Sequence, residues 1–197
     1  DIRKDALYCD PKDGTARRAA QTVLDLLFHR LTTWLAPILV FTMEEVWLER
    51  FPGDDSSVHL IDMPDTPDGW LDAELAAKWA GIRKVRGVVT AALEVQRREK
   101  VIGASLEAAP VVYVGDPALL DAARSVDFAD ICITSDIILT DDFAPADAFM
   151  ADTPATPVAV VFKAAEGQKC QRCWKVLPDV GLHAHPGVCG RCNDALG

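Results

Sequence analysis

The stretches Cys170-Gln171-Arg172-Cys173 and Cys189-Gly190-Arg191-Cys192 decide how the last part of this chain folds. Fifteen residues separate the two Cys-x-x-Cys pairs, a spacing within the range of four-cysteine zinc sites. Each pair is expected to form a tight turn that aims two sulfur atoms at one point, which gives the tetrahedral ligand set Cys170, Cys173, Cys189 and Cys192. Because four thiolates leave no position for a water, the one Zn²⁺ predicted there is structural and carries no chemistry.

Other interpretations of these cysteines stay open. Two disulfides or a redox Cys-x-x-Cys would use the same residues. His183 and His185 are alternative metal ligands, although four available cysteines favour a supporting or exposed position for them. The loop between the pairs holds two prolines, two glycines and little apolar sequence, which favours a zinc ribbon over a domain with its own large core.

The composition of the whole chain indicates an ordinary folded protein. Of its 197 residues, 50% are hydrophobic and 25% are charged, which supports globular folding without disulfides. Six cysteines, four of them in the metal pattern, fit a reducing compartment, and Cys9 and Cys132 are left as plain thiols. No apolar run is long enough to span a bilayer. We therefore expect a cytoplasmic monomer with no membrane partner.

The charge distribution matters more than the net charge. A formal net charge of −10 at pH 7 argues, taken as a whole, against nucleic-acid binding. However, residues 116–152 hold nine Asp against one Arg, whereas residues 83–100 hold six cations against two carboxylates. Residues 163–192 hold five cations against two carboxylates. Two modest basic faces are therefore expected beside one acidic stretch.

Residues 1–108 are predicted to form a helical-bundle domain. Apolar residues recur at helical spacing from Ala16 to Leu35, and the pattern resumes from Ile38 to Phe51 after Pro37 interrupts it. A longer helix is expected from about Leu71 to Lys100, with cations opposite its apolar stripe. We expect both helical stretches to share one bundle, whose interior includes Leu27, Leu31, Trp34, Val46, Trp47, Trp79 and Ile82.

Residues 109–166 are predicted to form a small α/β junction subdomain before a zinc ribbon at residues 167–197. Three segments are β-prone, at 111–114, 131–139 and 158–162, and a short helix is expected at 117–124, with an acidic, Pro-rich loop at 141–157. The predicted fold class is thus mainly α with a small α/β part and a C-terminal four-cysteine zinc ribbon. The sequence holds no phosphate-binding Gly loop, no Gly-x-Ser-x-Gly and no His-Glu-x-x-His, so no catalytic residue is predicted.

Several motifs resemble one enzyme family. The run Trp34–Trp47 resembles the anticodon-binding helical domain of class I aminoacyl-tRNA synthetases for aliphatic amino acids, and Val101–Ala108 is similar to the segment that closes that domain. Lys169–Trp174 and Cys189–Cys192 resemble the C-terminal zinc module of the bacterial isoleucyl enzymes, as does the opening Asp1–Tyr8. The helical motif alone would also fit valyl or leucyl enzymes, and the zinc knuckles favour the isoleucyl ones.

The resemblance implies a C-terminal, anticodon-recognising part of an ATP-dependent isoleucine–tRNA ligase. The HIGH and KMSKS signatures of that family's catalytic fold are absent from the sequence, as is its editing domain. The partner implied is the anticodon stem-loop of tRNA(Ile), ATP being used only by the catalytic domain, and this chain alone is expected to be inactive. The competing hypotheses are a zinc-ribbon module that docks a protein through residues 116–152, and the equivalent region of a valyl- or leucyl-type enzyme.

Two groups of residues are candidates for RNA contact. In the ribbon, Trp174 offers an aromatic plane and Arg172 a guanidinium for an unstacked anticodon base, with Lys175 and Arg191 nearby. Equally, Trp174 is a candidate for the miniature core of the ribbon. At the end of the long helix, phosphates of the anticodon stem are the expected partners of Arg97, Arg98 and Lys100.

Overall fold

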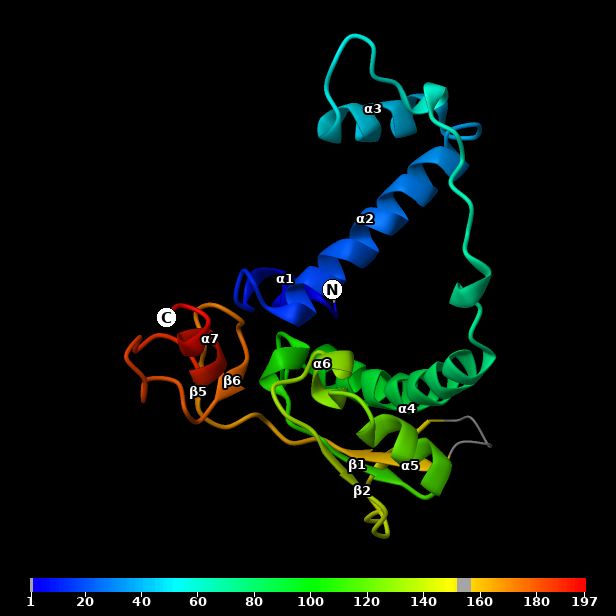
Figure 1. The fold of residues 1–197 in the computed structure, drawn as a ribbon. Coiled ribbons are helices and arrows are strands. Elements are labelled where there is room, and N and C mark those ends of the chain that lie inside the picture. The colour runs from blue at the N-terminus through cyan, green and yellow to red at the C-terminus, as the bar shows by residue number, and fades with distance from the viewer. Residues whose placement is uncertain (1, 152–156) are drawn as a thin grey trace. The chain divides into compact units, whose positions relative to one another are not determined.

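The computed structural model of the chain describes residues 2–151 and 157–197 (Figure 1). Its contacts divide the chain into two compact units, one formed by residues 12–71 and the other by residues 1–11 together with 72–197. Long helices dominate, with a small sheet and a two-stranded cysteine ribbon, which confirms the predicted fold class. The three-part division at residues 108 and 166 stays a prediction.

The unit of residues 12–71 is a helical hairpin with a small aromatic core. Its elements are α2 (Thr15–Leu35), α3 (Val40–Arg50) and the single turns η1 (Val58–Leu60) and η2 (Asp68–Trp70). Trp47 is 5% exposed and packs against the partly buried Phe28 and Phe51, while its indole N–H donates to Ser56 Oγ at 3.1 Å. Glu44 accepts the backbone N–H of Val58 at 2.9 Å, which holds the chain after α3 against that helix.

The other unit is built on α4 (Ala73–Arg98), whose buried stripe lies in the main core. Asp72 caps α4 by accepting the N–H of Leu75 at 2.8 Å. The remaining elements are η3 (Ser105–Glu107), β1 (Val111–Val114), α5 (Pro117–Arg124), α6 (Phe128–Cys132), β2 (Ile138–Thr140), β3 (Phe149–Met150) and β4 (Val158–Val161). The sheet order is β2-β1-β4-β3, with β2 parallel to β1, and β4 antiparallel to both β1 and β3.

Gly81 lies at the contact between α4 and α5. A Cβ placed on Gly81 would lie 3.2 Å from Leu119 Cδ2, closer than ordinary van der Waals contact. Ile82 and Val85, both fully buried, continue this face of α4 into the core that β1 and β4 complete. α4 also contacts α6, where Arg86 Nε donates to Ile131 O at 2.8 Å.

The predicted common bundle is wrong. The buried stripe of α4 belongs to the core with the sheet and α5, whereas α2 and α3 share a separate cluster. Of the predicted interior, Trp47 and Ile82 are buried, but Leu27, Leu31 and Trp34 are 43–48% exposed and Val46 is 37% exposed. Helical spacing identifies the apolar face of a helix but not the element that covers it, which is why these positions were assigned wrongly.

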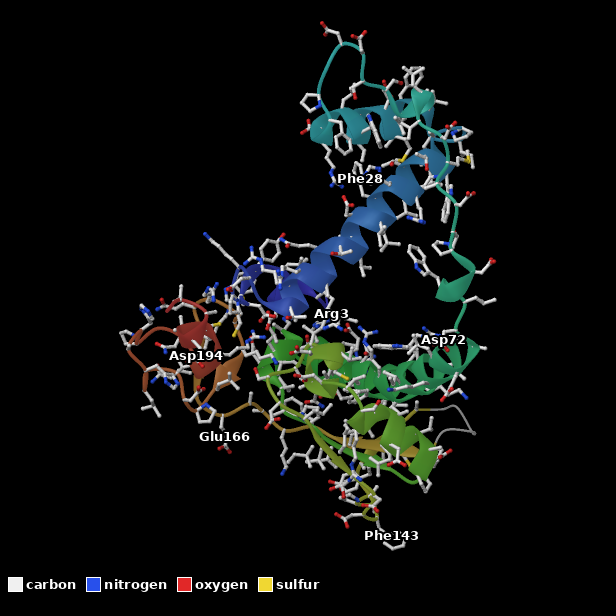
Figure 2. All side chains as sticks on the ribbon, viewed as in Figure 1. Arg3, Phe28, Asp72, Phe143, Glu166 and Asp194 are labelled. Atoms are coloured by element: carbon white, nitrogen blue, oxygen red, sulfur yellow. The ribbon has the colours of Figure 1, made fainter. Side chains whose placement is uncertain are left out.

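The β-prone stretch 131–139 is also only partly a strand. Asp127 caps α6 by accepting the N–H of Asp130 at 3.0 Å, and Ile133, at φ 59°, ends that helix in the left-handed region. Only Ile138–Thr140 pairs with β1. The predictions for β1, α5 and β4 are confirmed. In the predicted loop, residues 152–156 lie outside the described residues, 149–150 form β3, and Phe143 is fully exposed at the tip (Figure 2).

Replacing Trp47 by Ala should lower the free energy of unfolding of the hairpin by about 3–5 kcal/mol, because it removes a buried indole and leaves a cavity. Trp34→Ala is the matched control, since that ring is 43% exposed and should cost clearly less. Urea denaturation followed by circular dichroism measures both. Equal losses for the two variants would contradict this assignment of the core.

Candidate metal centre and nucleic-acid interface

The four cysteines of the two knuckles form one buried sulfur cluster. The first knuckle lies between β5 (Gln168–Lys169) and β6 (Val176–Leu177), and the second begins α7 (Gly190–Asp194). All four Sγ atoms lie within 4.8 Å of one another. Cys173 Sγ and Cys189 Sγ are 3.8 Å apart, far beyond the bond length of about 2.05 Å in a disulfide. The residues Cys170, Cys173, Cys189 and Cys192 therefore form a ligand set that fits a tetrahedral metal ion.

Backbone bonds shape the first knuckle around its sulfurs. The N–H of Cys170 donates to Lys175 O at 2.8 Å, and the N–H of Trp174 donates to Cys170 O at 3.0 Å. The N–H of Cys189 points at Cys170 Sγ from 3.4 Å. Such N–H groups stabilise a thiolate, which is the form of cysteine that binds metal.

The electrostatics of the cluster also favour a cation. Burial raises the pKa of the Cys192 thiol to about 12, and the neighbouring sulfurs add to this effect. Burial raises the pKa of Cys173 too. At Cys170 burial acts in the same direction, but backbone N–H groups outweigh it and lower the pKa to about 6. Four close thiols cannot all ionise by themselves, so a divalent ion that binds them must displace protons.

The two histidines of the ribbon have partners outside the sulfur cluster. His183 Nε2 lies 3.0 Å from Asp179 Oδ2, which also accepts the N–H of Gly190 at 2.7 Å. The hydrogen bond from the Gly190 N–H lowers the pKa of the Asp179 carboxyl, and the hydrogen bond with His183 lowers it further. His185 donates its backbone N–H to Asn193 Oδ1 at 3.2 Å. Both histidines therefore support the short helix α7 and its start.

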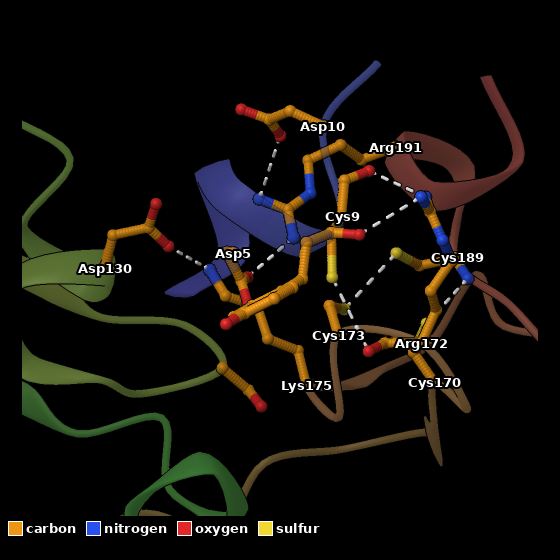
Figure 3. Close-up of polar contacts among 12 residues, drawn as sticks. Asp5, Cys9, Asp10, Asp130, Cys170, Arg172, Cys173, Lys175, Cys189 and Arg191 are labelled. Carbon is orange, nitrogen blue, oxygen red and sulfur yellow. Dashed lines mark hydrogen bonds and ion pairs between the residues drawn. The ribbon is translucent and has the colours of Figure 1, made fainter. Parts of the chain in front are cut away.

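The ribbon is completed by the beginning of the chain, an arrangement that no sequence pattern predicted. Arg172 Nη1 donates to Cys9 O at 2.6 Å, just after α1 (Lys4–Tyr8), and Arg172 Nη2 donates to Tyr8 O at 3.3 Å (Figure 3). Arg191 Nη2 donates to Asp5 Oδ2 at 2.6 Å. Cys9 itself is 3% exposed and packs in the ribbon's core with Val180 and Val188. We call residues 3–10 the clasp.

The clasp gives the knuckle arginines structural partners. Arg172 and Arg191 were predicted to touch RNA, and in the structure both hold the clasp. Lys175, a third candidate, bonds Asp130 at 2.6 Å, and both side chains are largely buried. The charges of the clasp could have indicated that it binds the ribbon, because Asp5 and Asp10 are opposite in charge to the arginines of the knuckles.

Trp174 stays outside the ribbon core. The ring is 50% exposed, and its backbone lies at φ 68° in the left-handed region. Lys4 Nζ lies 4.5 Å and Lys169 Nζ 5.5 Å from the ring centroid. The core of the ribbon is made instead by the cysteines, Val180 and Val188, with Leu177 packed against it. The interpretation of Trp174 as a miniature core is therefore wrong.

The candidates on α4 lie on the surface. Arg97 forms an exposed ion pair with Glu94 at 2.8 Å, whereas Arg98 and Lys100 are exposed and form no ion pair among the described residues. Lys100 has φ 61° where α4 ends. One pocket collects four of the predicted RNA-binding residues, namely Arg97, Arg172, Trp174 and Lys175, while Arg98, Lys100 and Arg191 do not line it.

Two known protein families match parts of this chain. Residues 1–113 match the family described as the anticodon-binding domain of tRNA ligase, and residues 167–195 match the zinc finger found in FPG and IleRS. Since the first match covers more than half of the chain, the chain belongs to the family of anticodon-binding domains of tRNA ligases. The zinc-finger match and the four-cysteine cluster together support a structural zinc.

Curated relatives of high similarity are isoleucine–tRNA ligases, which confirms the resemblance drawn from the motifs. The ligase of Ruegeria pomeroyi is 64% identical over 197 residues, and those of Agrobacterium fabrum and Bartonella henselae are 53% and 46% identical. Each match covers 100% of this chain and 20% of the relative, so the chain spans about one fifth of their length. Among the described residues, no helix is both long and apolar enough to cross a membrane.

The clasp should slow the loss of metal. Asp5→Asn removes the charge from a partly exposed ion pair, which is worth about 1 kcal/mol, so a chelator should remove zinc roughly fivefold faster. Asp194→Asn, an exposed carboxylate on the same module with no ion pair among those described, is the control and should change nothing. Zinc release is followed with a colorimetric chelator. An unchanged rate for Asp5→Asn would show that α1 is not coupled to the ribbon.

Proposed function

We propose that this chain is the anticodon-recognition region of an isoleucine–tRNA ligase and binds the anticodon stem-loop of tRNA(Ile). The observation that carries the proposal is Trp174, a half-exposed aromatic ring beside the sulfur cluster, in a chain of the anticodon-binding family. A bulky residue at φ 68° costs about 1–2 kcal/mol. That strain, together with an exposed ring, supports a binding role for Trp174 over a packing role.

The same proposal assigns one structural Zn²⁺ to Cys170, Cys173, Cys189 and Cys192. Apart from the sulfurs, the ribbon's core holds few apolar side chains, so the free energy of metal binding supplies most of the ribbon's folding free energy. The ion fixes the first knuckle and, with it, the position of Trp174. No catalytic role is assigned to it, since four thiolates close its shell.

The cations around Trp174 form two groups, those that already have partners within the protein and those that are exposed. Lys175 and Arg191 are paired with Asp130 and Asp5, which offset their charges, whereas Arg172 binds neutral carbonyls and adds positive potential to the RNA-facing side. Arg98 and Lys100 are exposed, and Arg97 forms only an exposed ion pair with Glu94, which contributes little to stability. These three residues of α4 and its end are the proposed contacts to stem phosphates, which give affinity without sequence information.

The chain's role is recognition, with chemistry elsewhere in the ligase. ATP and isoleucine would be used by a catalytic domain whose signatures this sequence lacks, in a monomeric, cytoplasmic enzyme. A protein-docking zinc module and the equivalent region of a valyl or leucyl enzyme are the alternatives, and neither is favoured by the family and the relatives.

Trp174→Ala should weaken binding of the tRNA(Ile) stem-loop by roughly ten- to hundredfold, because a stacking platform contributes about 1–3 kcal/mol per base. A stem-loop with another anticodon should bind the variant and the parent almost equally. Arg98→Ala should instead weaken both RNAs alike and reduce the salt slope by about 0.7 to 0.9. Fluorescence anisotropy at several salt concentrations measures the parent and both variants with each of the two RNAs.

The Trp174 variant must first be shown to hold zinc, since the ring adjoins the knuckle. If Trp174→Ala keeps its metal and lowers the affinity for both RNAs by the same factor, the ribbon does not recognise the anticodon.

A further inference from the structure

A fifth thiol lies in the core of the ribbon, beside the four cysteines that fit a metal ion. Cys9 is 3% exposed and packs in the same buried cluster as those four residues. Its S–H donates to Arg172 O at 3.5 Å, and the Cys192 thiol is a second hydrogen-bond partner. Cys9 does not belong to the set of sulfurs that lie within 4.8 Å of one another. It therefore adjoins the ligand set at Cys192 without being part of it.

Bonds from both knuckles hold this thiol in place. Arg172 Nη1 donates to the carbonyl of Cys9 itself at 2.6 Å (Figure 3). Arg191 pairs with Asp5 at 2.6 Å and with Asp10 at 3.8 Å, and these two carboxylates lie before and after Cys9 in the sequence. The clasp is thus held on both sides of the thiol, which keeps its place beside the second knuckle.

A pocket reaches the sulfur cluster on the side of Cys9. It has a volume of about 720 Å³ and lies between the clasp, the end of α4 and the first knuckle. Cys9 and Cys173 line this pocket, whereas the other three cysteines of the cluster do not. A chelator or an incoming metal ion therefore meets the fifth thiol on the same side as the ligand Cys173.

We propose that Cys9 is a reserve ligand of the metal centre, which takes the place of Cys192 when that sulfur leaves the ion. The proposal rests on the structural zinc of the proposed function and is independent of RNA recognition. In the exchange, Cys9 passes its S–H proton to the sulfur of Cys192, and the resulting Cys9 thiolate binds the ion. One metal–sulfur bond breaks and one forms, and the proton stays within the pair, so the net charge does not change.

The exchange makes the clasp a part of the metal centre. With Cys9 bound, four thiolates still close the shell of the ion. The ion then joins the first and last parts of the chain directly, in addition to the bonds that Arg172 and Arg191 make. Loss of the Cys192 sulfur therefore does not leave the ion with three ligands, and the ribbon keeps its metal.

Cobalt(II) bound in place of zinc tests the proposal, because its thiolate charge-transfer absorption grows with the number of bound sulfurs. Cys192→Ala should keep the parent's absorption, since Cys9 supplies the fourth thiolate. The double substitution of Cys9→Ala and Cys192→Ala should lower the absorption to about three quarters, with three thiolates left. Cys9→Ala alone should absorb as the parent does.

The matched control combines Cys132→Ala with Cys192→Ala. Cys132 is also buried but lies in the core with α4, so this double variant should keep the parent's absorption. If the parent binds cobalt through four thiolates but Cys192→Ala absorbs no more than the variant without Cys9 and Cys192, the reserve ligand is overturned and the structural zinc stands. A parent chain that binds cobalt through fewer than four thiolates, or not at all, overturns both.

A second measurement uses the parent chain and covers the case in which Cys192→Ala fails to fold. The zinc-loaded chain is treated with N-ethylmaleimide, and native mass spectrometry with fragmentation locates the label and detects the metal on the same molecules. Chains labelled once, on Cys192, are expected to keep their zinc, because Cys9 has replaced the modified sulfur. Loss of zinc from those chains, or the absence of label on Cys192 while the metal is bound, would overturn the proposal.

Discussion

Four sulfur atoms held within 4.8 Å of one another are the constraint on which the end of this structure depends. Burial raises the pKa of two of these thiols, and their mutual repulsion opposes ionising all four. A divalent ion removes this conflict by binding four thiolates at once, in exchange for protons. The ribbon has few other apolar contacts, so its knuckles keep their shape only as long as the sulfurs stay together.

The knuckle in turn organises residues that are distant in the sequence. Because Arg172 and Arg191 lie inside the two Cys-x-x-Cys turns, their guanidinium groups are held in fixed directions and hold the clasp through Asp5 and two backbone carbonyls. The clasp then contributes Cys9 to the ribbon's core and places Lys4 over Trp174. The proposed RNA-facing surface thus combines the first and last parts of the chain. Some of its cations bind other groups of the protein, and the others are exposed.

Local signals in the sequence predicted the parts that local physics determines. The cysteine spacing indicated the cluster, and the short helix expected at 117–124 is present as α5, which Asp116 caps. The predictions that failed concerned contacts that a local sequence pattern does not encode. The apolar stripe of α2 was recognised but not what covers it, and the β-prone 131–139 lost its first residues to a helix capped by Asp127. The clasp was missed because its contacts join residues 163 or more positions apart, without a periodic pattern.

Amide hydrogen exchange before and after zinc removal tests the central claim most directly. The account predicts that chelation abolishes protection at residues 170–174 and, at the same time, at the Leu7 and Cys9 amides of the clasp, which donate to Arg3 O and Asp5 O. The amides of β1 should keep their protection, because that strand lies in the separate core with α4. Continued protection of the clasp after the metal has left, or protein purified without chelator that carries no zinc, would contradict the account.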